Sequence, residues 1–179
     1  MDRRSARTRA QLNEALLLLL SERSYEAVSV DEICRRAGVG RSTFYAHFRD
    51  KEELKSSQLT PLQRRLSSAT ETAKTDSRFA FSLPMLEHAR ENLSLYRSLV
   101  RHGSTEAMFP AMRQMLAERV EAELAGRRFE GPLSEFPRKH LAKAVVSTFF
   151  ALMLAWRDDG AFEPERQVDA AFHAMLRLA

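Results

Sequence analysis

The sequence contains few of the residues that interrupt helices or cross-link chains. Its 179 residues include 6 glycines, 6 prolines and a single cysteine, Cys34. Because glycine and proline weaken helices most, their scarcity and an apolar content of 44% favour an all-helical protein with a sizeable core. A single cysteine also excludes an intramolecular disulfide, which is compatible with a reducing cytoplasm.

Long apolar segments and targeting signals are missing as well. The most apolar segment, residues 141–156, contains Lys143 and is too short for a membrane-spanning helix. The apolar run 16–20 is surrounded by polar residues and no small-residue cleavage site follows it, so it does not look like a secretory signal. We therefore expect a cytoplasmic protein that has no membrane partner.

The motifs of common enzyme and metal sites are absent too. The sequence shows no nucleophile elbow, no phosphate-binding glycine loop and no paired acid–base residues, so we expect no enzyme activity. His88 and His102 are too far apart in the sequence for a compact pair of metal ligands. We therefore predict neither a metal site nor a cofactor.

Charge of one sign is only weakly in excess. The net charge of +4 is by itself poor evidence for a nucleic-acid partner. Its distribution says more, because four arginines crowd the N-terminus against a single acid, Asp2: Arg3, Arg4, Arg7 and Arg9. Such a cluster suits phosphate contacts, although a solvated tail explains it equally well.

Residues 29–51 are the most informative stretch, because they have the pattern of a helix, a tight turn and a second short helix. Ser29 and Glu32 have the spacing of a capping box at the start of the first helix. Gly38 lies where that helix must end, and Ser42 is placed to cap the second helix.

The second helix has one apolar face and one polar face. Phe44 and Phe48, four residues apart, share the buried face. Asp50 and Glu53 have the spacing of a reciprocal cap on the helix that follows. The residues left to face outward are Arg41, Thr43, Tyr45 and His47. This pattern predicts a helix-turn-helix, which places one helix in the major groove of DNA.

The run from Ser29 to Leu54, above all residues 39–54, resembles the DNA-binding domain of TetR-family transcription regulators. The similarity covers roughly residues 8–55. The segment 86–103 and the apolar helix near Phe149 are similar to a common type of TetR C-terminal domain. The resemblance implies an all-α fold of about nine helices, with a three-helix DNA-binding head over residues 1–55 and a helical ligand-binding and dimerisation domain over residues 56–179.

The resemblance also implies roles for the polar residues of the head. Arg41 and Thr43 match positions that reach base edges, and most of the others match positions that contact phosphates. Tyr45 as a half-buried core aromatic and His47 as an ordinary surface residue are the alternatives. The predicted DNA-contacting residues are Ser29, Arg41, Ser42, Thr43, Tyr45, His47 and Lys51.

The segment from Leu141 to Trp156 reads as a helix that is apolar on nearly every side. Such a helix must be covered by more than one neighbour. One side can pack on its own subunit and the other on a partner chain, as in the four-helix dimer interface of the TetR family; complete burial in one subunit is the alternative. The predicted dimer residues are Leu141, Val145, Thr148, Leu152, Val168, Phe172 and Met175.

Methionines and aromatic residues recur at helical spacing in the C-terminal part. Such stripes are usually ordinary core, but methionine adapts to irregular cavities, and TetR-family bodies typically hold an inducer pocket. We expect a small, mainly apolar effector. The predicted lining residues are Leu86, Tyr96, Leu99, Met112, Leu116, Phe149, Met153 and Trp156.

Residues 51–72 are expected to form the helix that links head and body, with a kink or a break at Pro61. The polar stretch 70–78 would be a linker. Together these features predict a sequence-specific, DNA-binding homodimer that acts as a ligand-responsive repressor on a palindromic operator. The alternative is a transcriptional activator, or a regulator controlled by a protein co-effector.

Overall fold

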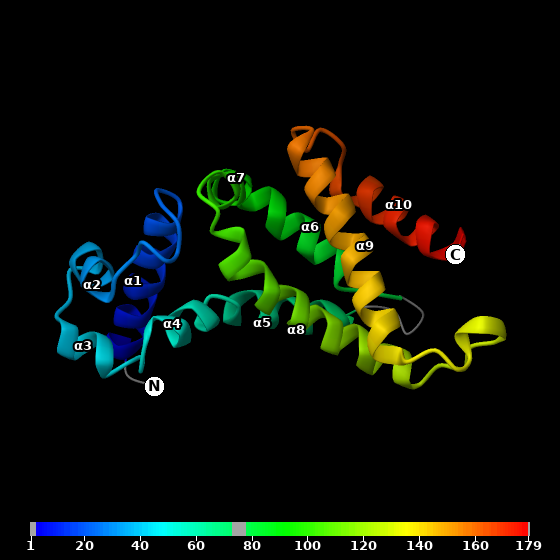
Figure 1. Cartoon of the computed structure of the whole chain (residues 1–179), viewed down its shortest axis with the longest axis horizontal. Helices are drawn as coiled ribbons and strands as arrows, with labels where there is room; N and C mark the ends of the chain where they lie inside the picture. The colour runs from blue at the N-terminus through cyan, green and yellow to red at the C-terminus, as the bar shows by residue number, and fades with distance from the viewer. Residues whose placement is uncertain (1–2, 73–77, 179) are drawn as a thin grey trace. The chain divides into compact units, whose positions relative to one another are not determined.

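The protein is all-helical in the part of the chain that its computed structural model describes, residues 3–72 and 78–178 (Figure 1). The helices are α1 Arg3–Leu20, α2 Val30–Ala37, α3 Arg41–Tyr45, α4 Lys51–Ser57, α5 Thr60–Thr72, α6 Ser82–Glu91, α7 Leu93–Arg101, α8 Thr105–Ala125, the short 3₁₀ helix η1 Gly131–Leu133, α9 Arg138–Asp158 and α10 Glu165–Leu178. The predicted all-α fold with an N-terminal helix-turn-helix is confirmed. No helix in the described ranges is both long and apolar enough to cross a membrane.

The helix expected over residues 51–72 is divided into α4 and α5. Pro61 is the second residue of α5, where its missing N–H would have no helical partner in any case. The expected break therefore occurs just before the proline and adds one helix to the predicted number. Of the predicted linker 70–78, residues 73–77 lie outside the described residues.

The chain forms two compact units. Unit 1 comprises Met1–Gln63 and Asn92–Phe109, and unit 2 comprises Arg64–Glu91 and Pro110–Ala179. The helix-turn-helix therefore shares a unit with α7 and the first turn of α8. The division into functional domains after residue 55 stays a prediction.

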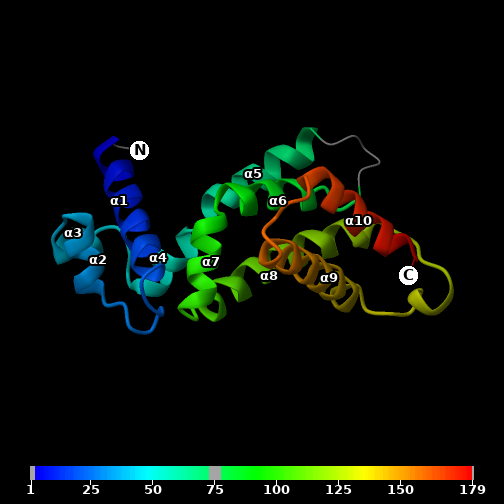
Figure 2. The same ribbon diagram turned by 90° about the horizontal axis from the view of Figure 1, so that it is seen from above.

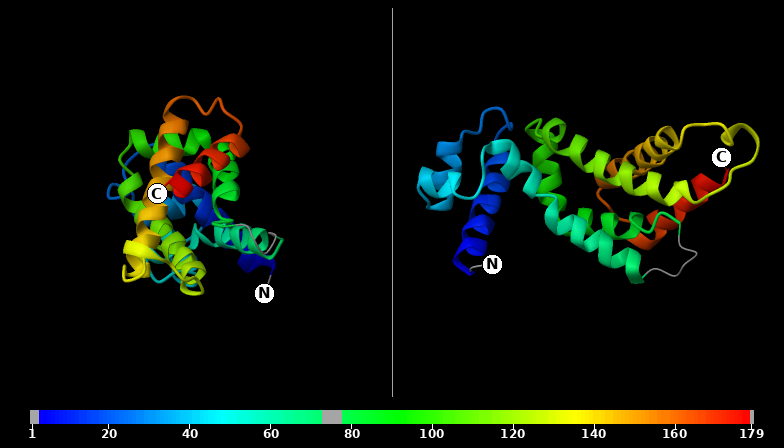
Figure 3. Two further views of the ribbon diagram at one scale, coloured as in Figure 1. Left: turned by 90° about the vertical axis from the view of Figure 1, so that its right-hand side faces the viewer. Right: turned by 90° about the horizontal axis from the view of Figure 1, so that it is seen from below.

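In unit 1, α1 packs against α2 and α4 (Figure 3, right). Its apolar face is buried, and Leu12 and Leu16 have no exposed surface. Helix α7 also contacts α1. At the end of α7 the buried Ser104 donates its hydroxyl hydrogen to the carbonyl oxygen of Arg23, at 3.2 Å. This hydrogen bond ties the α7–α8 turn to the segment between α1 and α2.

In unit 2, α10 packs against both α6 and α9 (Figure 2). The centre of this packing is Phe172, whose ring centroid lies 5.3 Å from that of Phe149, 6.2 Å from that of Phe81 and 6.3 Å from that of Phe79. Edge-to-face and tilted pairs of this kind add to the stabilisation that burial provides.

This packing corrects two of the predicted dimer residues. Phe172 is 0% exposed and Val168 is 6% exposed within a single chain, so neither side chain has surface to offer a partner. The periodicity placed them correctly on an apolar face of α10, but that face covers α6 and α9 of the same chain. The other five, Leu141, Val145, Thr148, Leu152 and Met175, keep part of their surface exposed.

Candidate nucleic-acid interface

Helix α2 begins with the predicted capping box. The backbone N–H of Glu32 donates to the hydroxyl of Ser29 at 3.3 Å. In return, the backbone N–H and the hydroxyl of Ser29 donate to the Glu32 carboxylate, at 2.9 and 2.8 Å. These hydrogen bonds lower the pKa of Glu32. The two groups of Ser29 that a phosphate would use are therefore occupied by a carboxylate in this state.

The turn between the two motif helices depends on a glycine. Gly38 has φ +67°, in the left-handed region that costs glycine least, and the N–H of Val39 donates to the carbonyl of Cys34 at 3.0 Å. The expected cap of α3 is wrong, because Gly40 is the N-cap and no side chain caps the helix. Ser42 is instead an exposed residue of the first turn of α3.

Two phenylalanines hold this segment against the head. Phe44 is 0% exposed and Phe48 is 1% exposed, and their ring centroids are 6.0 Å apart. Behind them Arg9 stacks its guanidinium 4.4 Å from the centre of the Phe48 ring and donates to the carbonyl oxygen of His47 at 3.1 Å. At least one arginine of the N-terminal cluster, Arg9, therefore stabilises the helix-turn-helix by contacts within the head.

The opposite side of α3 carries polar and aromatic groups. Arg41, Ser42 and Tyr45 are exposed, and Thr43 and His47 are half-buried. Tyr45 keeps 49% of its surface exposed while the edge of its ring meets Phe44. The outward orientation predicted for Tyr45 is confirmed, and the alternative of a core aromatic is excluded.

Lys51, at the start of α4, uses its ammonium group inside the head. Its Nζ donates to the carbonyl oxygens of Tyr25 and Val28, at 2.8 and 2.7 Å, and lies 4.1 Å from the centre of the Tyr25 ring. Burial lowers the pKa of Lys51. Since an ammonium group has three hydrogens, one remains for a phosphate.

Tyr25 is a residue that the sequence analysis missed. Its hydroxyl donates to the Glu52 carboxylate, and burial raises its pKa. The Nζ of Lys55 also lies over its ring, at 4.5 Å from the centre. Nothing in the local pattern around residue 25 shows that it meets α4, because the two segments are far apart in the sequence.

The start of α4 shows half of the predicted reciprocal cap. The Asp50 carboxylate accepts the N–H of Glu53 at 2.7 Å, as expected. The Glu53 carboxylate, however, accepts the backbone N–H and the Nε–H of Arg49, at 2.8 and 3.1 Å. Arg49 is therefore linked to α4, although its side chain is 85% exposed.

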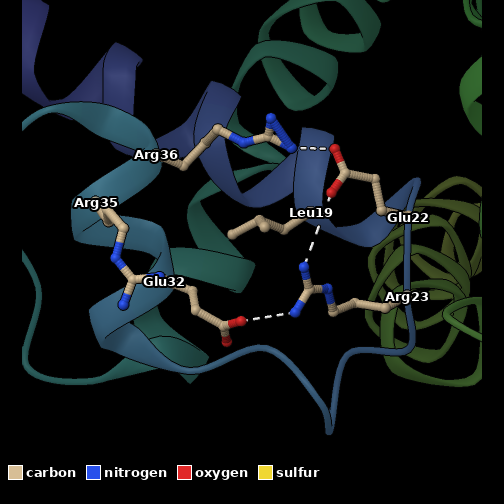
Figure 4. Close-up of a pocket in the computed structure, with 6 residues that line it drawn as sticks. All are labelled: Leu19, Glu22, Arg23, Glu32, Arg35 and Arg36. Atoms are coloured by element: carbon tan, nitrogen blue, oxygen red, sulfur yellow. Dashed lines mark hydrogen bonds and ion pairs between the residues drawn. The ribbon is translucent and has the colours of Figure 1, made fainter.

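A pocket of about 450 Å³ lies between the end of α1 and α2 (Figure 4). Four of its charged residues form ion pairs: Arg23 donates to Glu32 at 2.6 Å, and Arg36 pairs with Glu22. These two ion pairs join the segment that follows α1 to α2.

The predicted effector-lining residues are all buried, and they are divided between the two units. Tyr96 and Leu99 belong to unit 1, and the other six belong to unit 2. A second pocket, of about 400 Å³, is lined by none of them and lies in unit 1 beside Leu17, Leu18 and Leu95.

Comparison with known proteins supports what the geometry indicates. Residues 13–55 match the sequence profile described as "Bacterial regulatory proteins, tetR family". Over these residues the predicted resemblance to the DNA-binding domain of the TetR family is confirmed. Members of the TetR family are DNA-binding transcription regulators and mostly repressors.

Solved structures show the same fold over almost the whole length. A TetR transcriptional regulator from Streptococcus agalactiae is 21% identical with a TM-score of 0.70, and 97% of this chain and 96% of that chain are covered. NalD of Pseudomonas aeruginosa, the secondary repressor of the MexAB-OprM multidrug efflux pump, is 20% identical with a TM-score of 0.67 and the same coverage. The dihydroxyacetone kinase operon activator DhaS is 16% identical with a TM-score of 0.58, and 96% of this chain and 97% of that chain are covered.

The capping box makes the stability of this TetR-family head depend on pH. Because the folded pKa of Glu32 is lowered, its contribution is fully present above the unfolded pKa of about 4.3 and is lost as the pH falls through the folded pKa. Ser29→Ala removes the hydroxyl donor, so we expect a smaller loss of stability on acidification and about 1 kcal/mol less stability at pH 7.

Urea unfolding between pH 7 and pH 3 measures this difference. Ser42→Ala is the matched control, since Ser42 caps nothing and its removal leaves the acid dependence unchanged. An acid-dependent loss in Ser29→Ala equal to that of the wild type would contradict the assignment.

Proposed function

We propose that this TetR-family protein is a dimeric repressor that reads a palindromic operator through α3 and is released by a small, mainly apolar effector. The observation that carries the proposal is the two-sided character of residues 41–48. Phe44 and Phe48 are buried on one side, and Arg41, Ser42 and Tyr45 are exposed on the other. A helix whose apolar face is packed on the head and whose polar face is exposed is suited to enter the major groove.

Within this proposal, contacts to bases and contacts to phosphates come from different residues. Arg41 and Thr43 read base edges at the start of α3, because arginine can bind guanine through two hydrogen bonds. Tyr45, His47 and the remaining hydrogen of Lys51 contact the phosphates beside them. Ser42 contributes either kind of contact.

Ser29 takes part only if Glu32 gives up its hydrogen bonds. A phosphate oxygen would replace the Glu32 carboxylate at the N–H and hydroxyl of Ser29, at the N-terminus of α2. Glu32 would keep its bond to Arg23, at 2.6 Å. DNA binding at this position is thus an exchange of one anion for another.

The homodimer is supported by the outer side of α9. Four of its partly exposed residues recur at helical spacing, at 141, 145, 148 and 152, and Ala144, Ala151 and Ala155 are exposed beside them. Met175 on α10 is 39% exposed. Small and apolar side chains on one surface let two helices approach closely and lose water, which favours a partner of the same kind.

Buried methionines support the effector part of the proposal. Met85, Met112 and Met153 lie in the core of unit 2, where flexible thioether side chains can repack around a guest. Release from DNA requires that the effector bind the DNA-free conformation more tightly. Lysate of the producing bacterium, added to operator complexes, is expected to release them; unchanged operator affinity at every lysate concentration would contradict the switch.

Tyr45→Ala tests the DNA-binding surface. We expect it to abolish most operator binding without lowering the melting temperature, because half of this side chain is exposed in the DNA-free protein. The operator is found by footprinting the DNA that flanks the gene, or by selection from random duplexes, and binding is measured at two salt concentrations. Phosphate contacts predict that wild-type affinity falls steeply as the salt concentration rises.

Val100→Ala is the control, since Val100 is similarly exposed (45%) but lies outside the motif. It should bind the operator as the wild type does. If Tyr45→Ala kept its affinity, or if it unfolded the head, the proposed surface would be wrong. The position of the footprint relative to the promoter separates repression from activation.

Ala151→Arg tests the dimer. Ala151 is exposed on α9, so the longer side chain is tolerated by a single chain but places a charge in the proposed interface. We expect monomers in analytical ultracentrifugation, at concentrations where the wild type is a dimer, and a large loss of operator affinity. Ala111→Arg, the same change at an exposed position of α8, should leave the dimer intact. A dimeric Ala151→Arg protein would exclude this face.

A further inference from the structure

The side chain of Arg41 is held by a residue that no functional prediction included. Its Nη1 donates to Oδ1 of Asp31 at 2.7 Å, a bond from the first residue of α3 to the second residue of α2. The guanidinium carbon also lies 5.9 Å from the centre of the Tyr45 ring. Asp31 and Arg41 therefore connect the two helices of the motif on the side where Tyr45 is exposed.

This pair contributes little to the stability of the head. The side chains of Arg41 and Asp31 are 61% and 53% exposed, and ion pairs in water are weak. The buried phenylalanines, together with Arg9 and Lys51, already hold the motif from behind. The ion pair is therefore more important for the orientation of the Arg41 side chain than for the stability of the head.

The bond to Asp31 leaves the part of the guanidinium that guanine needs. Arginine has five N–H donors in a planar fork, and the contact to Asp31 uses only one, on Nη1. The edge formed by Nε and Nη2 can still donate to O6 and N7 of a guanine. A long side chain that is already oriented loses less conformational entropy when it binds.

We propose that Asp31 is a positioning residue that orients Arg41 for guanine and so determines the base preference of the head. The inference rests on the proposed function and adds to it a residue and a base: the operator half-site contains a guanine whose recognition depends on both side chains. Asp31 acts through Arg41, and its own charge weakens binding to DNA in general, because it repels phosphates.

An inhibitory role for Asp31 predicts a different effect of its removal on DNA binding. If its carboxylate only kept Arg41 away from DNA, removal of the charge would strengthen binding to every sequence and leave the base preference as it was. A positioning residue has the reverse effect: preference at one base pair is lost, while affinity for unrelated DNA stays the same or rises slightly.

The test is Asp31→Asn, which keeps the size of the side chain and removes its charge. Wild-type protein first selects its preferred sites from random duplex DNA. Binding of each variant is then measured on that site and on versions in which each half-site base pair is changed in turn. Arg41→Ala identifies the guanine, as the base pair at which preference disappears.

At that base pair we expect Asp31→Asn to lose about tenfold of the preference for guanine, since a two-bond arginine–guanine contact supports a discrimination of that order or more. Preference at the other base pairs is unchanged. In the Arg41→Ala background, Asp31→Asn has no further effect on base preference, because there is no guanidinium to position. Asp31→Glu, which can still pair with Arg41, restores part of the preference.

Glu26→Gln is the charge-matched control, an exposed acid of the same head whose removal tests for a general effect of net charge. Tighter binding of Asp31→Asn with an unchanged preference would overturn the proposal, as would an unchanged profile or a wild-type site without an Arg41-dependent guanine. A wild-type protein that selects no sequence at all would instead refute the proposed function, so the two failures are distinguishable.

Discussion

The burial of Phe44 and Phe48 is the interaction on which the proposed DNA-binding surface of this protein depends. Helix α3 has only 5 residues, far fewer than an isolated helix needs in water. It has no side-chain cap, so burial of its apolar face provides most of what keeps it helical. The packing of these two rings in the core of the head fixes the position of the polar side chains on the exposed face of α3.

Charged side chains have a second task in this head, because several of them hold the backbone in place. Arg9 donates to a carbonyl oxygen beside Phe48, and Lys51 donates to two carbonyl oxygens in the segment before α2. Glu32 occupies the amide and hydroxyl of Ser29. The net charge of +4 therefore does not tell which of the cations are available for phosphates. The proposed DNA contacts come chiefly from residues of α3.

Local patterns in the sequence predicted most of the fold, because capping boxes, glycine turns and apolar periodicity act over a few residues. The errors have the same origin. Ser42 has the chemistry of a cap, yet the helix begins one residue earlier, at Arg41, with Gly40 as its N-cap. The apolar face of α10 was recognised, but periodicity does not say whether it covers its own chain or a partner, and Phe172 covers its own.

Contacts between distant segments account for what the sequence could not predict in the site. Tyr25 meets α4 and Asp31 meets Arg41 only because the fold brings them together, and neither spacing has a local signature. The same limit applies to the effector. Buried methionines and aromatics have the same spacing in a solid core and around a ligand, so composition alone does not separate the two.

The single cysteine has a practical consequence for kinetics. Cys34 lies on α2, is 4% exposed, and has a pKa raised by burial. Because a thiol is alkylated only as an accessible thiolate, modification of this protein has to wait until the head opens around Cys34. The alkylation rate of the native protein therefore counts how often the head opens, and the same count in the presence of operator DNA reports how far the DNA suppresses that opening.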